Sequence, residues 1–253
     1  MEIIKFKKDK GNTYKIYFDD GNIISLYDDV IIKYNLLINK LMDNNKFNEI
    51  TEYNDFLDGY YKSIKYINKK LRTELEIEKY LNKLEIKKSD IDKIIKLLYK
   101  DGYLNKEIYY KAYINDKYNL SSDGPYKIKN NLIKLGYKDE EFVDYLFSLD
   151  WSIKLNNIIN KKIKINHKLS NNMLKNKLLN DLIKIGYDKL SIIEILDKSI
   201  LDSDINVLKK ELNKIKNKYT SKYRGDELEY KIINYLYKKG FKLEDIKRCL
   251  DEE

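Results

Sequence analysis

Past residue 70, the hydrophobic positions of the chain repeat with a period of about 50 residues. Four segments, 80–95, 131–146, 181–196 and 235–250, align without a gap. In each copy, apolar residues recur four positions apart, which places them on one face of a helix. After a short interruption two further apolar columns follow, so each copy is predicted to be two helices with facing apolar stripes. The columns are Ile77, Ile128, Leu178 and Ile232; Leu81, Leu132, Leu182 and Leu236; Ile91, Phe142, Ile192 and Ile246; and Ile95, Leu146, Leu196 and Leu250.

The interruption between the two helices has a pattern of its own. Gly136, Gly186 and Gly240 each follow the last apolar turn of the first helix and precede an aromatic residue. Glycine past a helix end adopts the left-handed conformation, and the next apolar residue folds back onto the last turn. The first copy has Glu85 followed by Ile86 at this place, so its turn is expected to differ or to be strained.

Two helices fill about half of each period, so a third helix is expected between copies. The segments 105–118, 151–165 and 202–219 have the apolar spacing that such a helix needs. We therefore predict an elongated array of three-helix units in which mostly neighbouring units touch. The predicted units span 60–100, 102–149, 151–200 and 202–253.

Residues 1–59 follow a different pattern. Aromatic and β-branched runs at 14–18 and 23–27 flank Asp20-Gly21, which is a hairpin signal because glycine accepts the positive φ of a tight turn. A third strand is expected over 2–7, and helical segments over about 28–58 connect this sheet to the repeats. The predicted fold class is therefore mainly α, with tandem three-helix repeats and a small β-rich N-terminal element. One proline and nine glycines in 253 residues agree with a helical chain.

Local sequence also marks several helix starts. Thr73 with Glu76, and Asp226 with Glu229, have the spacing of a capping box. Pro125 suits the first position of a helix, because its missing N–H has no partner there in any case. We expect helices to begin at these three places.

Charge is unevenly distributed along the chain. The formal net charge is +9, yet residues 1–60 hold 8 lysines and 11 acids, so the positive excess lies in residues 61–253. Residues 151–180 contain seven lysines and no acid, and residues 205–225 contain six lysines, Arg224 and the single acid Glu211. Such tracts favour contact with DNA phosphates or with an acidic protein surface. The alternative is a solvated helix face in a lysine-rich protein.

Side-chain counts exclude several chemistries. Cys249 and His167 are the only cysteine and histidine, so neither a disulfide framework, a CxxC redox pair nor a cysteine–histidine zinc site can form within one chain. Glycine-rich phosphate-binding motifs are absent, and no catalytic constellation is apparent, so neither an enzyme nor a cofactor is expected. The sequence has no apolar signal segment and no run of about 18 apolar residues. A cytoplasmic protein that does not enter membranes is expected.

The aromatic residues have a structural interpretation. Most of the 24 tyrosines lie at helical spacing beside isoleucine and leucine, which favours packing with an exposed hydroxyl over base stacking. Trp151 opens a helix directly after one repeat ends, so it is expected to pack between repeats. Cys249 lies in an apolar column and is expected to be a small buried filler. His167, in the connector 165–168, is given no catalytic role.

A series of short motifs occurs in a fixed order along the chain: Tyr66, Leu71-Arg72-Thr73-Glu74-Leu75, Leu81, Gly102-Tyr103-Leu104, Tyr110, Ala112-Tyr113, Gly124-Pro125, Lys127-Ile128, Leu132 and Lys239-Gly240-Phe241. None is specific alone. In this order and spacing the chain resembles the RecX regulatory proteins of bacterial recombination, over nearly its whole length and in the manner of the longer, Gram-positive-type members. It departs from the family pattern at Asn105-Lys106, where two aspartates are usual, and at Leu135-Gly136, where Lys-Gly is usual.

The resemblance implies a non-enzymatic modulator that binds the RecA filament on single-stranded DNA and inhibits its growth, ATP hydrolysis and strand exchange. The implied partners are the RecA recombinase filament and single-stranded DNA, with double-stranded DNA as a further candidate. The protein is expected to act as a monomer. The candidate residues for binding RecA or DNA are Arg72, Lys127, Lys129, Lys154, Lys161, Lys162, Lys164, Lys168, Lys175, Lys177 and Lys239.

Other functions stay open on the residues alone. One is a helical module that binds DNA directly and acts without RecA. Another is a helical scaffold for some other acidic protein, and an enzyme is the least supported. The first alternative differs from the RecA hypothesis in one testable respect. Inhibition that arises from competition for the strand vanishes when free DNA is in large excess.

Overall fold

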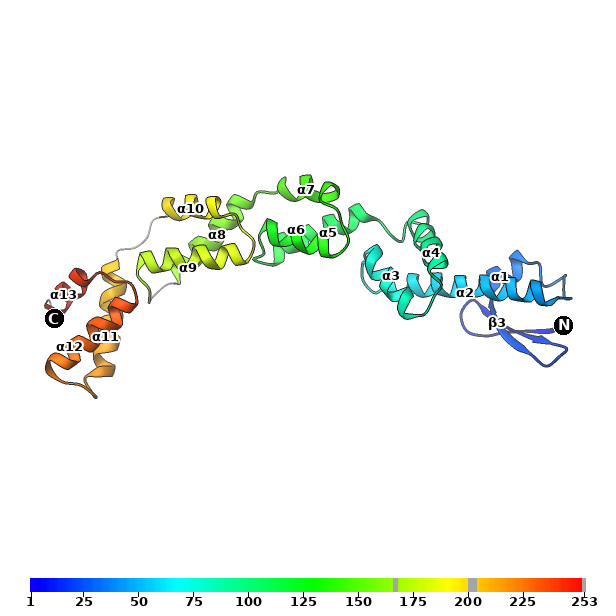
Figure 1. Ribbon diagram of the computed structural model, residues 1–253, viewed down its shortest axis with the longest axis horizontal. Helices are drawn as coiled ribbons and strands as arrows, with labels where there is room; N and C mark the ends of the chain where they lie inside the picture. The colour runs from blue at the N-terminus through cyan, green and yellow to red at the C-terminus, as the bar shows by residue number, and fades with distance from the viewer. Residues whose placement is uncertain (166–167, 200–203, 252–253) are drawn as a thin grey trace. The chain divides into compact units, whose positions relative to one another are not determined.

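The computed structural model describes residues 1–165, 168–199 and 204–251 (Figure 1). The predicted fold class is confirmed, since helices labelled α1 to α13 follow a three-stranded antiparallel sheet in these ranges. By its internal contacts the chain divides into two compact units, Met1–Tyr109 and Tyr110–Glu253. Each unit is described by itself.

The sheet of the first unit consists of β1 (Ile3–Lys8), β2 (Thr13–Phe18) and β3 (Ile23–Tyr27), antiparallel in the order β1-β2-β3. Gly21 lies between β2 and β3 with a φ of 85°, so the predicted hairpin is confirmed. Alternate side chains of a strand point to opposite faces, and one face of this sheet supplies a core. Its most deeply buried members, at most 1% exposed, are Ile3, Ile16, Phe18 and Leu26.

The segment after the sheet corrects one prediction. The sequence predicts helices over 28–58, but α1 (Asp28–Lys33) and α2 (Asn44–Ile67) are separated by ten residues that are not helical. Here the N–H of Ile3 donates to the carbonyl of Lys40, and the N–H of Met42 donates to that of Met1, over 3.0 Å each. Because these backbone groups bond to the start of the chain, they are not available to a helix.

The helices α2, α3 (Glu74–Lys83) and α4 (Lys88–Lys100) share a second core in the first unit. The predicted capping box is confirmed, because Thr73 and Glu76 each accept the other's backbone N–H. The turn after α3 has the same left-handed form and is strained, one of the two expected outcomes, since Glu85 has a φ of 60°, a conformation unusual for a residue other than glycine.

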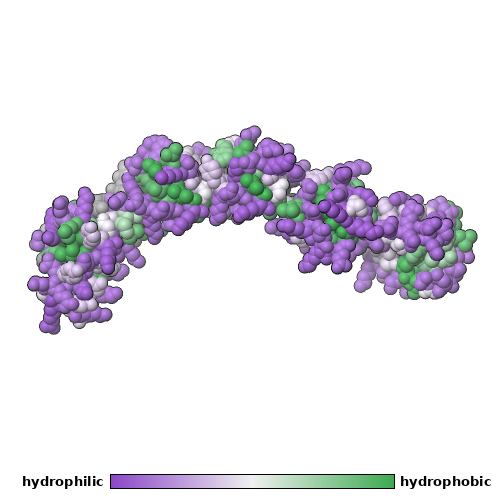
Figure 2. Space-filling model, viewed as in Figure 1, coloured by the Kyte–Doolittle hydropathy of each residue, from purple (hydrophilic) through white to green (hydrophobic). Residues whose placement is uncertain are grey.

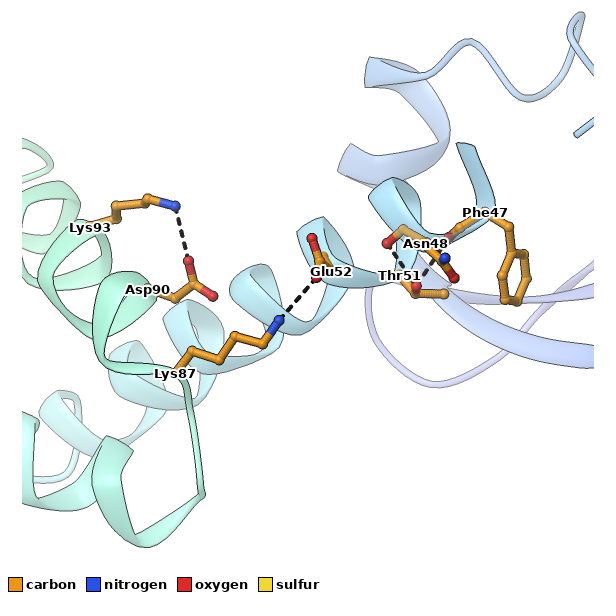
Figure 3. A network of polar contacts seen from close by, with 7 residues as sticks. All are labelled: Phe47, Asn48, Thr51, Glu52, Lys87, Asp90 and Lys93. Atoms are coloured by element: carbon orange, nitrogen blue, oxygen red, sulfur yellow. Dashed lines mark hydrogen bonds and ion pairs between the residues drawn. The ribbon is translucent and has the colours of Figure 1, made fainter. Parts of the chain in front are cut away.

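An exposed network links α4 to α2 (Figure 3). The Nζ of Lys87, at the start of α4, lies 3.0 Å from a carboxylate oxygen of Glu52 in α2, and Lys93 pairs with Asp90 at the same distance. These lysines are exposed, so each ion pair contributes only about 0–1 kcal/mol. The packing of apolar side chains between the helices holds this part together.

The second unit continues with three groups of three helices. The helix α5 begins just before the unit boundary and the helix α11 follows residues outside the described ranges. The groups are α5 (Lys106–Leu120), α6 (Pro125–Lys134) and α7 (Asp139–Phe147); α8 (Trp151–Lys164), α9 (Asn171–Lys184) and α10 (Lys189–Lys198); and α11 (Asp204–Tyr219), α12 (Gly225–Lys238) and α13 (Leu243–Asp251).

The apolar columns found in the sequence form the interiors of these helical groups. Figure 2 shows hydrophilic residues over most of the visible surface, with hydrophobic residues in separate patches. Gly136, Gly186 and Gly240 have φ values of 94°, 91° and 85°, so the predicted turns are confirmed. The column residues that are at most 2% exposed are Ile77, Leu81, Ile91, Ile128, Leu132, Phe142, Leu146, Leu182, Ile192, Ile232, Leu236 and Ile246.

The other two predicted helix starts have opposite outcomes. Pro125 is the first residue of α6, as predicted. The capping box at Asp226 is wrong, because α12 begins one residue earlier, at Gly225, and Arg224 occupies the N-cap without a side-chain hydrogen bond. Asp226 therefore lies inside the first turn, where its charge is favourable to the helix dipole but does not cap.

A backbone junction joins the second and third helical groups, where the start of α6 lies on the end of α9. The N–H groups of Gly124 and Tyr126 donate to the carbonyls of Ile185 and Gly186, over 2.7 and 3.1 Å. A Cβ on Gly186 would overlap the backbone nitrogen of Lys127 and lie 2.6 Å from its Cβ. The first amides and the last carbonyls of helices lack partners within their own helix, so this junction satisfies both.

The third and fourth groups meet in the same way. The N–H of Ser170, the N-cap of α9, donates to the carbonyl of Lys239 at the end of α12 over 3.3 Å. A Cβ on Gly240 would overlap Met173 and lie 2.7 Å from the Ser170 hydroxyl oxygen. Gly186 and Gly240 thus each have two roles, because they supply the positive φ and admit the start of the preceding group's second helix.

Candidate functional site

Trp151 packs where the second and third helical groups meet, as predicted. Its indole N–H donates to the carbonyl of Leu146 over 2.8 Å. Its ring lies edge-on to those of Tyr118 and Tyr187, with centroids 5.0 and 6.3 Å away. Burial raises the pKa of Tyr187, whose hydroxyl makes no hydrogen bond with the described residues. This cluster is a packed junction in which Trp151 and Tyr118 are partly buried.

Lys154 belongs to the same junction. Its ammonium group donates to the carbonyl of Lys117, over 3.1 Å, and to that of Tyr118, so it satisfies the last carbonyls of α5. Burial lowers the pKa of Lys154 below its ordinary value. The structure therefore gives this predicted contact residue an internal role.

Arg72 has an internal role as well. Its guanidinium donates to Glu76 over 3.1 Å and lies over the ring of Tyr66, 3.9 Å from the centroid. The Tyr66 ring in turn stacks on Tyr80, with centroids 4.4 Å apart. Since Glu76 also closes the capping box, Arg72 helps to fix the start of α3.

Three further candidates form ion pairs at the surface of the second unit. Lys127 pairs with Asp123 at 2.7 Å, Lys129 with Asp139 at 2.5 Å, and Lys175 with Asp197 at 3.2 Å. Partly exposed pairs of this kind are worth about 0–1 kcal/mol, so an anionic partner can displace the carboxylate at small expense. These lysines can bind an anionic partner, but only once their present ion pairs are broken.

Lys239 is bound to a buried carboxylate. Its ammonium group donates to Glu211, which is 4% exposed and also accepts the hydroxyl of Tyr235 over 3.4 Å. Burial by itself would lower the pKa of Lys239, but the hydrogen bonds with Glu211 and Tyr235 outweigh it and raise this pKa. Sequence reasoning missed Glu211, although its place between Leu208 and Leu212 on the buried stripe of α11 is a signal.

The remaining candidates are at the surface of α8 and α9. Lys161 and Lys164 in the last turn of α8, and Lys177 in α9, are exposed and form no ion pair with the described residues. Lys162 is half-buried and Lys168 is exposed. Within the acid-free tract 151–180, two of the exposed cations thus stand together at the end of α8.

Possible metal ligands and a surface groove complete the description of these surfaces. Within the described ranges, no three His, Cys, Asp or Glu side chains are grouped to hold a metal ion. Cys249 is buried, as predicted, and His167 lies outside the described residues. A groove of about 670 Å³ between α8 and α10 is lined mainly by neutral hydroxyl and amide groups, among them Ser152, Asn156 and Asn160. In the part of the chain that is described, no helix combines the length and apolar character that a bilayer crossing requires.

Known proteins resemble this chain over its whole length. No protein-family model matches it. The regulatory protein RecX of Lactococcus lactis subsp. lactis (strain IL1403) is 32% identical over 247 residues, which are 92% of this chain and 90% of that protein. The regulatory protein RecX of Streptococcus agalactiae serotype Ia is 30% identical over 259 residues, which are 100% of this chain and 99% of that one.

Solved structures share the fold. A crystal structure of a regulatory protein RecX superimposes with a TM-score of 0.68 and 19% identity, over 78% of this chain and 99% of that chain. RecX from Lactobacillus salivarius superimposes with a TM-score of 0.52 and 28% identity, over 57% of this chain and 96% of that chain. The chain also shares more than 30% identity with a RecX protein over nine-tenths of both sequences. It therefore belongs to the RecX family.

Proposed function

We propose that this protein binds the RecA filament on single-stranded DNA and inhibits its growth, ATP hydrolysis and strand exchange, as a monomer and without catalysis of its own. The observation that carries the proposal is the similarity to regulatory proteins named RecX over the full chain. The cytoplasm, where DNA and its recombinase meet, is the proposed location.

The construction of the chain supports a role that depends on contact area. The helical groups have the same arrangement, and buried apolar side chains form the interiors of the first, third and fourth groups. Several weak contacts made by linked modules bind far more tightly together than singly. We propose that the units at 60–100, 102–149, 151–200 and 202–253 are such modules, each meeting part of the filament.

The test measures ATP hydrolysis by RecA on single-stranded DNA, with and without this protein, while the DNA is raised to large excess. Inhibition that persists at high DNA supports a filament target. Inhibition that disappears as free DNA rises contradicts the proposal, because it means competition for the strand. That result would favour the second candidate, a helical module that acts on DNA directly. The exposed cations at the end of α8 support this candidate.

Replacing Lys161, Lys162 and Lys164 with glutamine is expected to weaken filament binding and flatten its salt dependence. Each lysine that meets an anion releases counterions on binding, so its loss lowers the slope of log affinity against log salt by up to about 1. The measurement is binding to RecA filaments at several salt concentrations.

The matched control replaces Lys7, Lys10 and Lys15 with glutamine, three exposed lysines of the N-terminal segment that lie outside the four proposed modules and give the same change in net charge. The control is expected to bind nearly as the parent protein does. Equal affinity of the parent and the first variant would move the interface away from the end of α8.

A further inference from the structure

The second helices of the three groups in the second unit carry the same polar pattern on their outer faces. In α6, α9 and α12 a lysine is followed by asparagine three positions later and by lysine seven positions later. Residues at these spacings lie on one side of a helix. We name this surface the lysine–asparagine face; its residues are Lys127, Asn130 and Lys134, then Lys177, Asn180 and Lys184, then Lys231, Asn234 and Lys238.

The face is turned to solvent in each helix. All of its residues are exposed except Asn234, which is half-buried, while the intervening column residues such as Leu132 and Leu236 are fully buried. Exposed apolar side chains lie beside it on the same helices. Their exposed fractions are 47% for Tyr126, 44% for Ile133, 41% for Ile183, 65% for Tyr230 and 63% for Tyr237.

The three faces follow one another in space. The start of α6 contacts the end of α9 through Gly186, and the start of α9 contacts the end of α12 through Lys239. Lys127 lies at the first of these junctions, against Gly186. Lys184, the last residue of α9, is two positions before Gly186 in the sequence. The repeated pattern therefore occurs on helices that adjoin one another, the start of one at the end of the next.

The face is electropositive on α6 and α9, whereas α12 carries the acids Asp226, Glu227 and Glu229 near its start. The helix α6 contains three lysines and no acid, and α9 contains one acid, Asp181. Among the described residues, only Lys127 of the six lysines forms an ion pair, with Asp123. The first repeat does not continue the pattern, since Glu76 stands where the others have the first lysine and is engaged by Arg72 and the capping box.

We propose that the lysine–asparagine face binds the phosphate backbone of single-stranded DNA. A polynucleotide presents the same anion at regular intervals, which matches a surface that presents the same cations and amides on three successive helices. Lysine and asparagine are both common donors to phosphate oxygens, and neighbouring apolar or aromatic side chains suit unpaired bases. The inference goes beyond the proposed function, because it concerns the strand alone and its test contains no RecA.

The test uses the full chain and a fluorescently labelled thymidine oligonucleotide, with binding followed by anisotropy between about 50 and 200 mM salt. Replacing Lys134, Lys184 and Lys238 with glutamine removes one cation from each helix. The slope of log affinity against log salt is expected to become shallower by about 2, since each phosphate contact to a single strand contributes about 0.7. The control replaces Lys210, Lys214 and Lys218, exposed on α11, and is expected to leave the slope almost unchanged.

A second variant guards against loss of folding. Replacing Asn130, Asn180 and Asn234 with alanine favours the helices, because alanine has the higher helix propensity. It removes uncharged donors only, so affinity is expected to fall at every salt concentration while the slope stays that of the parent. Circular dichroism verifies that both variants keep their helix content.

Two outcomes would overturn the inference. If the α11 control lost as much affinity as the lysine variant, binding would depend on net charge and not on this face. If the lysine variant bound the strand with the affinity and salt dependence of the parent, the face would not contact the strand. The proposed function would survive the second outcome, so the failures of the two proposals are distinguishable.

Discussion

Replacing Gly186 with valine is expected to destabilise the second unit by roughly 3 kcal/mol or more. A β-branched residue at a φ of 91° is strained by about 1–3 kcal/mol. The side chain would also overlap the backbone of Lys127, and relieving such an overlap in a packed site costs a further 1–3 kcal/mol or so. The junction between α6 and α9 would have to open, with loss of the hydrogen bonds that Gly124 and Tyr126 donate.

The measurement is urea unfolding followed by the fluorescence of Trp151, the single tryptophan, which lies at this junction. Gly225→Val is the matched control, because Gly225 has a φ of 56° but no atom lies within 4 Å of the place that a Cβ would take. It is expected to show the backbone strain alone. Equal losses of stability in the two variants would contradict a close helix junction at Gly186.

Replacing Lys239 with methionine is expected to lower the free energy of unfolding by about 3 kcal/mol. The change leaves the Glu211 carboxylate buried without its cation, and removing one partner of a buried pair typically costs about 3–5 kcal/mol. The lower end applies here because the Lys239 side chain is partly open to water and Tyr235 still donates to Glu211. Any loss of binding in this variant would follow from the loss of folded protein, although the sequence predicts Lys239 as a contact residue.

The double variant Lys239→Met/Glu211→Leu separates the charge from the packing. It is expected to regain most of the lost stability, because an apolar pair of similar volume replaces a buried ion pair with little loss. No recovery in the double variant would mean that the stem of Lys239, and not its charge, is what matters.

The same ion pair predicts a pH dependence. The pKa of Lys239 is higher in the folded protein than the ordinary lysine value of about 10.4. Its contribution to stability is therefore complete below that value and is lost as the pH rises through the folded pKa. Unfolding measured between neutral and strongly alkaline pH is expected to show this loss in the parent protein and not in the double variant.

Repetition is what made the fold predictable from sequence. A single Gly-aromatic pair is a weak signal, but Gly136, Gly186 and Gly240 stand at the same place in aligned copies, and the left-handed turn has few other solutions. The non-helical segment 34–43 escaped prediction because its backbone partners, Met1 and Ile3, are distant in sequence. Local patterns do not report such pairings.

The candidate surface was less predictable, because a lysine's role depends on what reaches it from other segments. The tract 151–180 contains no acid, yet Asp197 pairs with Lys175 and the carbonyls of residues 117 and 118 accept from Lys154. Conversely, the acid at Glu211 looked like a minor exception in a basic tract and is the buried partner of Lys239. Spacing along a helix indicates which face a side chain is on, but not its partner.

Glu85 has a consequence for how long such a series of modules becomes. At the equivalent turns, Gly186 and Gly240 admit the start of another helix only because they lack a Cβ. Glu85 has the same left-handed backbone but carries a charged side chain. A further module, or a second molecule offering the exposed start of its α12, would find that seat occupied. End-to-end stacking of copies through this turn is therefore disfavoured, because the Glu85 side chain would have to move out of the seat.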